Sequence, residues 1–114
     1  MGQLGIDEQT LAGAPAIRLS GRLDYATSPA LRTILLKFVD KEGQCIIVDL
    51  TGVEYADTSG LATLLEAHAR LRKHGGRMVF FGLTDQVRDL FAMNEVDRML
   101  TIVADEAAAA QLAG

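Results

Sequence analysis

The sequence predicts an α/β fold: a small, mostly parallel or mixed β-sheet of four to five strands, with the main crossover helices on one side. Short apolar runs alternate along the chain with segments whose apolar residues recur at the spacing of one helix face. This alternation implies parallel strand pairing through right-handed crossovers. The connections are short, which favours laying each strand beside the preceding one. The helices that join the strands are therefore expected on the same side of the sheet.

The N-terminal third of the chain carries the first strand and helix signals. Residues 3–10 give a weak signal for an edge strand, and Ala16–Leu19 is a short strand that Ser20-Gly21 is expected to close. The first helix is expected to start at Thr27-Ser28, because Pro29 then falls at a position that favours proline. Its apolar face consists of Leu31, Ile34, Leu35 and Phe38.

The centre of the chain predicts a buried strand, a long helix and a second buried strand. The β-branched run Ile46–Val48 is typical of a strand covered on both faces. The second helix is expected from about Ser59 to His74, where Gly75-Gly76 ends it. Met78–Phe81 is the next buried strand. The predicted apolar face of the second helix consists of Leu61, Leu64, Leu65, His68 and Leu71.

The C-terminal third repeats the pattern with shorter elements. Thr84 is expected to cap a third helix that carries Val87, Leu90 and Phe91. A last strand is predicted near Leu100–Val103, and a final helix from about Asp105 to Leu112.

Composition limits the function classes that fit this chain. At 114 residues, with 49% hydrophobic and 23% charged residues, the sequence predicts one globular domain spanning 1–114. The net charge of −4 and the lack of a Lys/Arg cluster argue against a nucleic-acid partner. No apolar run approaches the roughly 20 residues of a membrane span, and Met1–Thr10 lacks the features of a signal peptide. We therefore expect a cytoplasmic protein that does not insert into a membrane.

Two hydroxyl residues stand at the predicted start of the second helix. Thr58 and Ser59 fall at or near its N-cap, where a side-chain oxygen can accept a hydrogen bond from a free helical N–H. A helix N-terminus also favours negative charge, so the fold itself would tolerate a phosphate there. Most segments of this kind serve only as caps. Local sequence alone leaves capping and a functional site as alternatives.

Polar residues also gather in the loops that follow two predicted strands, Gly21–Thr27 and Val53–Gly60. Loops at the carboxyl ends of parallel strands are where such sheets usually present function. If the two strands are neighbours, Asp24 and Asp57 approach the same surface as Ser59. A polar cluster built from separate segments is harder to explain as helix capping alone.

The chain resembles the STAS domains, and within that family the bacterial anti-sigma factor antagonists. The pattern combines glycine-x-leucine-aspartate after the second strand with aspartate-(serine/threonine)-serine-glycine-leucine at the second helix. Here these motifs are Gly21, Leu23 and Asp24, followed by Asp57–Leu61. The resemblance extends through Gly75–Arg77 and Val87–Phe91, nearly the whole length. One departure is Glu95, where relatives often carry glycine; it is expected to affect only a turn.

The resemblance implies the STAS fold and a protein-binding switch controlled by phosphorylation at Ser59. The unphosphorylated form would bind an anti-sigma factor serine kinase of the histidine-kinase-like ATPase type and free its sigma factor or other client. The kinase would inactivate the switch, and a PP2C-like phosphatase would restore it. ATP and magnesium would belong to the kinase, so no cofactor or metal is expected in this chain.

The resemblance also implies which residues contact the partner. Asp24, Tyr25, Asp57, Thr58 and Gly60 form the expected docking surface around Ser59. Ser59 is preferred to Thr58 as the modified residue because the family pattern points to it. A second reason is that Gly60 would leave room for a kinase active site to close over the hydroxyl.

Two other functions compete with the switch. If the chain were an enzyme with Ser59 as its nucleophile, the serine would need an activating base within about 3 Å. The only histidines are His68 and His74. Their i, i+6 spacing places them on opposite sides of the helix, so we expect no shared metal. Both lie well beyond Ser59 and the sequence shows no sign of a pocket, so we expect no catalysis. The stronger alternative is a non-switching STAS scaffold subunit of a lipid-transport ATPase or signalling assembly. A neighbouring kinase gene would favour the switch, and a transporter operon the scaffold.

Overall fold

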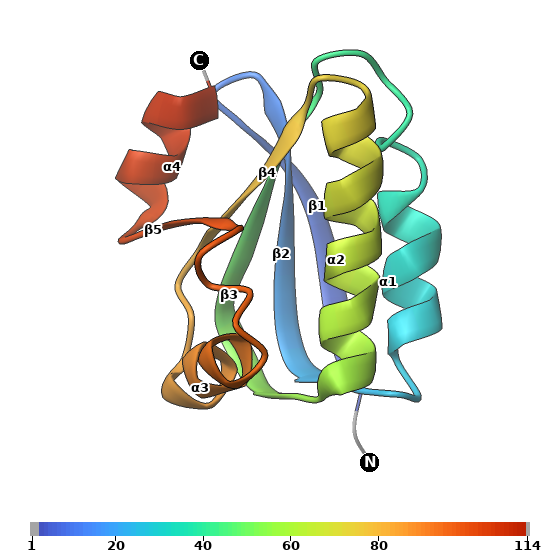
Figure 1. Cartoon of the computed structure of the whole chain (residues 1–114), viewed down its shortest axis with the longest axis vertical. Helices are drawn as coiled ribbons and strands as arrows, with labels where there is room; N and C mark the ends of the chain where they lie inside the picture. Colours follow the sequence, from blue (N-terminus) through green and yellow to red (C-terminus); the bar gives the residue numbers. More distant parts are fainter. Residues whose placement is uncertain (1–2, 114) are drawn as a thin grey trace.

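Five strands form one sheet, and each lies beside the strand that precedes it in the chain (Figure 1). In this computed structural model, which describes residues 3–113, β1 (Leu4–Leu11) pairs antiparallel with β2 (Ala14–Leu23). The pairs β2–β3, β3–β4 and β4–β5 are all parallel. The bounds of the last three strands are Cys45–Ala56, Arg77–Phe81 and Thr101–Val103. The predicted fold class and strand order are confirmed, and residues 3–10 do contribute the edge strand.

The helices lie on both faces of the sheet, but unequally. The crossover helices α1 (Ser28–Leu35), α2 (Thr58–Lys73) and α3 (Asp85–Met93) supply apolar side chains to the larger core on one face. Their common side follows from right-handed crossovers that all advance in the same direction across the sheet. The last helix, α4 (Glu106–Ala113), packs Ala109 into a smaller cluster on the other face (Figure 1). Within residues 3–113, no helix has the length and apolar character needed to cross a lipid bilayer.

The central strand β3 is buried from both sides, as its β-branched run predicts. Ile46, Val48 and Leu50 enter the larger core, whereas Ile47 enters the cluster beneath α4. This alternation is the period-2 pattern of a strand covered on both faces. On the α3 side the core includes an edge-to-face contact between Phe80 and Phe91, with ring centroids 5.9 Å apart.

Strands β2 and β3 run further than the sequence predicted. Ser20-Gly21 does not close β2, which continues to Leu23, and β3 continues through the expected loop to Ala56. The two strands stay paired up to Leu23 and Ala56 because two register shifts absorb the turn-like residues. The expected loops are therefore short, and Asp24 and Asp57 directly follow paired strand ends.

Two turns that follow helices contain a residue with a positive φ angle. Gly75 ends α2 with a φ of +73°, and the N–H of Gly76 donates to the carbonyl of Leu71 at 2.8 Å. Glu95, after α3, adopts a φ of +58°, in the left-handed region that favours glycine. The departure from the family pattern therefore falls on a turn, as expected.

The predicted buried face of α2 is confirmed for Leu61, Leu64 and Leu71, which are at most 3% exposed. Leu65 and His68 are half-buried at the margin of this face. Replacing Leu64 by alanine should lower the free energy of unfolding by about 2–5 kcal/mol, because it removes buried methyl groups and leaves a cavity. Urea denaturation measures this change, and Leu65→Ala should cost less. Unchanged stability together with lost partner binding would contradict a core role for Leu64.

Candidate functional site

Asp57 joins the two segments that the sequence singled out. Its Oδ1 accepts a hydrogen bond from the N–H of Gly60 at 3.0 Å, and its Oδ2 accepts one from the N–H of Tyr25 at 3.1 Å. Its own N–H donates to the carbonyl of Leu23 at 3.1 Å. One carboxylate thus caps α2 and holds the β2–α1 loop against the helix N-terminus. The predicted approach of the two loops occurs because β2 and β3 are neighbours.

The helix cap differs from the sequence expectation. Asp57 is the N-cap of α2, so Thr58 and Ser59 are the first two helical residues and neither hydroxyl caps the helix. The carboxylate takes the Gly60 N–H, because aspartate is among the preferred N-cap residues. Thr58 is exposed and Ser59 partly exposed. Within residues 3–113, the Ser59 hydroxyl makes no hydrogen bond.

Gly60 has a structural role that the sequence analysis did not foresee. The residue is buried, and an added Cβ would come within 2.5 Å of Leu23 Cγ and 2.6 Å of the Leu23 carbonyl oxygen. Glycine is needed here because α2 begins in contact with the end of β2. Packing against Leu23 accounts for glycine at this position, and the burial of Gly60 gives no support to direct partner contact. That Gly60 also makes room for an incoming kinase active site stays a prediction.

Asp24 organises the β2–α1 loop through its side chain. Its Oδ1 accepts hydrogen bonds from the N–H groups of Ala26 at 3.0 Å and Thr27 at 3.2 Å, and Arg22 Nε lies 3.4 Å from its Oδ2. Partial desolvation raises the pKa of this carboxyl, but the hydrogen bonds from Thr27, Ala26 and Arg22 together lower it below its ordinary value. Asp24 is thus a turn residue held as a carboxylate beside the 80% exposed side chain of Tyr25.

Residues missed by the sequence analysis complete this surface. The guanidinium carbon of Arg22 lies 4.4 Å from the ring centroid of Tyr55, a half-exposed residue at the end of β3. Beyond Tyr55, a hollow of about 490 Å³ separates the start of α2 from α3. The α3 residues that line it are Gln86, Asp89, Leu90 and Met93. Met93 is 81% exposed, which the sequence pattern did not indicate.

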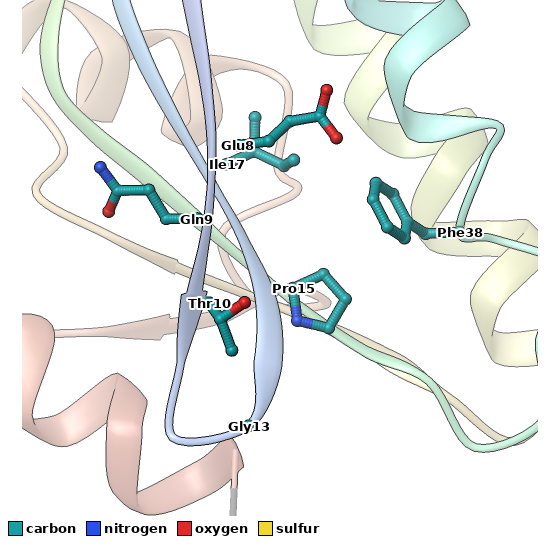
Figure 2. A pocket seen from close by; sticks show the side chains of 7 residues that line it. All are labelled: Glu8, Gln9, Thr10, Gly13, Pro15, Ile17 and Phe38. Carbon is teal, nitrogen blue, oxygen red and sulfur yellow. The ribbon is translucent and has the colours of Figure 1, made fainter.

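A second hollow, of about 370 Å³, lies at the opposite end of the sheet (Figure 2). It is formed by the β1–β2 hairpin and by Phe38, which follows α1, with Pro15 and Ile17 among its apolar residues. Glu8 at its edge pairs with Lys37 at 3.0 Å. The hollow contains none of the residues predicted for the functional site.

The two histidines lie away from Ser59 on the same helix. His68 is half-buried, and among the described residues its buried Nδ1 has no hydrogen-bond partner. Burial lowers the pKa of His68, and the nearby charge of Arg72 lowers it further. His74 is the C-cap of α2, and its Nδ1 lies 3.2 Å from a Glu42 carboxylate oxygen. Across residues 3–113, no group of three or more His, Cys, Asp or Glu side chains is arranged to hold a metal ion.

Comparison with known proteins identifies the family of this chain. A family model described as the STAS domain matches residues 6–109. The chain belongs to the STAS-domain family. This STAS chain is 33% identical over 86 residues to the anti-sigma-B factor antagonist of Listeria monocytogenes, and the match covers 75% of each protein.

Solved structures support the same fold. An anti-sigma-factor antagonist (STAS) domain protein from Planctomyces limnophilus superposes with a TM-score of 0.86 at 15% identity, over 95% of this chain and 97% of that one. SpoIIAA in its unphosphorylated form superposes with a TM-score of 0.78 at 20% identity, over 95% and 96%. The Bacillus cell fate determinant SpoIIAA in its phosphorylated form gives 0.72 at 19% identity, over 96% and 99%.

The packing of Gly60 predicts whether alanine at this position raises or lowers the stability of the protein. At an open helix position, replacing glycine by alanine stabilises a protein by about 0.5–1 kcal/mol. Gly60→Ala should instead destabilise this protein by about 1–3 kcal/mol, because the new methyl group overlaps the Leu23 backbone. Denaturant unfolding measures the change. A stabilised Gly60→Ala variant would show that α2 does not begin against β2 as described.

The hydrogen bonds to Asp24 predict its titration. Because its folded-state pKa lies below the unfolded value of about 3.9, the group contributes stability that is present above that value and is lost as pH falls through the lowered folded pKa. Carboxyl ¹³C NMR should give a midpoint below that of aspartate in an unstructured peptide. Thr27→Val should move the midpoint upward, since it removes the hydroxyl 3.3 Å from Oδ1. A midpoint at or above the peptide value would refute this network.

Proposed function

We propose that this STAS protein is an anti-sigma factor antagonist whose partner binding is switched off by phosphorylation of Ser59. In this proposal the unphosphorylated protein binds an anti-sigma factor serine kinase of the histidine-kinase-like ATPase type and frees a sigma factor or other client. A PP2C-like phosphatase removes the phosphate. The proposal is supported by the 33% identity to a protein named as an anti-sigma-B factor antagonist, and by SpoIIAA, whose structures are described in both phosphorylation states.

The observation that carries the proposal is the position of the Ser59 hydroxyl. It stands on the second residue of α2, partly exposed, beside a carboxylate that already satisfies the cap. Because the Asp57 carboxylate takes the Gly60 N–H, the Ser59 oxygen is not engaged in capping and remains available as a nucleophile. The hydrogen bond from the Tyr25 N–H to Asp57 would hold in place the helix terminus that carries this hydroxyl.

In the proposed transfer this chain is a substrate and not an enzyme. The Ser59 oxygen attacks the γ-phosphorus of ATP held by the kinase, the hydroxyl proton passes to a base, and the bond to the ADP leaving group breaks. Nucleotide and magnesium stay with the kinase. The product differs from the starting protein by about −1.5 to −2 charges at neutral pH.

The charge added by the phosphate would also account for release of the kinase. A phosphate on Ser59 would lie beside Asp57 and against the nucleotide phosphates of the bound kinase, so like charges repel and the contact volume is filled. Within the free protein, the N-terminus of α2 partly neutralises the added charge. Phosphorylation is therefore expected to weaken binding while leaving the fold intact.

The test begins with Ser59→Ala as bait to isolate the cognate kinase, which is then purified. With ATP and magnesium, this kinase should modify Ser59 alone. Ser59→Ala should bind as tightly as the unmodified protein, because it loses an unpartnered hydroxyl, whereas Ser59→Asp should bind at least about tenfold more weakly. Phosphopeptide mapping and calorimetry give the readouts.

Thr58→Ala tests which hydroxyl is modified, because Thr58 is the exposed neighbouring hydroxyl and the phosphate should still be found on Ser59. Modification of Thr58, or a Ser59→Asp variant that binds like the unmodified chain, would contradict the switch. A chain that is never phosphorylated and is isolated with a transporter would instead favour the scaffold function.

A further inference from the structure

Helix α3 is fastened to the strand that leads into Ser59. The side-chain Oε1 of Gln86 accepts a hydrogen bond from the N–H of Ala56 at 2.8 Å, and its Nε2 donates to the carbonyl of Ala56 at 2.7 Å. The hydroxyl of Thr84, at the N-cap of α3, donates to the carbonyl of Val53 at 3.0 Å instead of capping its helix. Three side-chain hydrogen bonds thus join α3 to β3.

These bonds occupy the part of β3 that has no β4 partner. Strand β4 ends at Phe81, which pairs with Asp49, so the edge of β3 from Leu50 to Ala56 is not covered by the next strand. The Gln86 amide pairs with Ala56 as a neighbouring strand would. As a result, α3 forms a fixed wall of the hollow whose other wall contains Asp57 and Thr58.

The hollow combines negative charge with exposed apolar surface. Its acidic lining residues are Asp57 and Asp89, and its apolar lining residues include Leu90 and Met93. Met93 is 81% exposed, so its side chain is accessible to a partner, and methionine is common at adaptable binding surfaces. Asp89 is exposed and, within residues 3–113, has no ion-pair partner. Arg22, which lies over the Tyr55 ring, also pairs with Asp24.

We propose that this hollow receives one basic side chain, arginine or lysine, from the anti-sigma factor kinase. Its charged group pairs with Asp89 and Asp57, and its methylene stem packs on Leu90 and Met93. This inference rests on the proposed function and extends the docking surface from the start of α2 to α3.

Side-chain chemistry favours this occupant. Arginine and lysine combine an apolar stem with a cationic end, which matches a hollow that has apolar and acidic walls. Each Asp57 oxygen accepts one backbone hydrogen bond and retains a further lone pair for a donor. An acidic side chain or a free phosphate would meet two carboxylates and is disfavoured. The net charge of −4 also favours a basic partner surface.

Two groove variants with matched controls test the proposal. Asp89→Lys should weaken binding of the unphosphorylated protein to the purified kinase at least about tenfold, because it reverses the charge that faces the basic side chain. Asp97→Lys makes the same charge change at an exposed turn outside the hollow, and affinity should stay within about twofold. Met93→Ala should weaken binding about fivefold or more by loss of buried apolar contact. Met99→Ala, at another exposed methionine, is its control.

Calorimetry at low and high salt gives the affinities, and thermal unfolding confirms that each variant folds. The difference between Asp89→Lys and the unmodified protein should shrink at high salt, since salt screens the charge pair. A kinase variant with one interface arginine or lysine changed to glutamate should bind Asp89→Lys better than it binds the unmodified chain.

The failures of the two proposals are distinguishable. If Ser59 is phosphorylated and the kinase binds, but both groove variants bind within about twofold of the unmodified protein, the basic-side-chain proposal is overturned and the switch stands. If Asp89→Lys abolishes a dimer seen by sedimentation and leaves kinase affinity unchanged, a second copy occupies the hollow and the proposal is also overturned. If the kinase neither binds nor phosphorylates the chain, both proposals fail.

Discussion

The arrangement of the candidate site depends on one carboxylate, that of Asp57. Its two oxygens take N–H groups from different segments, one at the start of α2 and one in the β2–α1 loop. A serine or threonine cap would have offered a single oxygen and would have consumed the hydroxyl. Aspartate instead satisfies the helix terminus and fixes the loop at once, and it leaves Ser59 free. Because Asp57 caps the helix, the Ser59 hydroxyl remains available for the proposed phosphorylation.

The packing of the backbone around Asp57 determines which side chains lie together at the candidate site. The buried Gly60 lets α2 begin against Leu23, and the paired ends of β2 and β3 bring Asp24 and Asp57 to adjacent positions. On the other side, Gln86 holds α3 against Ala56. The Ser59 region therefore sits between two anchored walls, so a partner would meet a preformed surface and would pay little to order it.

The sequence predicted the elements well because hydrophobic periodicity and the β-branched run of β3 report on burial directly. It predicted the ends of β2 and β3 poorly. Serine, glycine and threonine usually mark turns, yet here the register shifts between the two strands accommodate Gly21 and Gly52 inside the sheet. It also did not reveal that Gly60 packs against Leu23, since the two residues lie far apart in the chain.

By itself, the sequence determined the α/β class, the strand order and the identity of Asp24, Asp57 and Ser59 as site candidates, because spacing and motif are local properties of the chain. Only the tertiary structure decided that Asp57 also binds the Tyr25 loop, why residue 60 is glycine, and that α3 borders the site. These features depend on pairs such as Asp57 with Tyr25 and Gln86 with Ala56, about thirty residues apart. Such contacts form only when the sheet has assembled, and no local pattern encodes them.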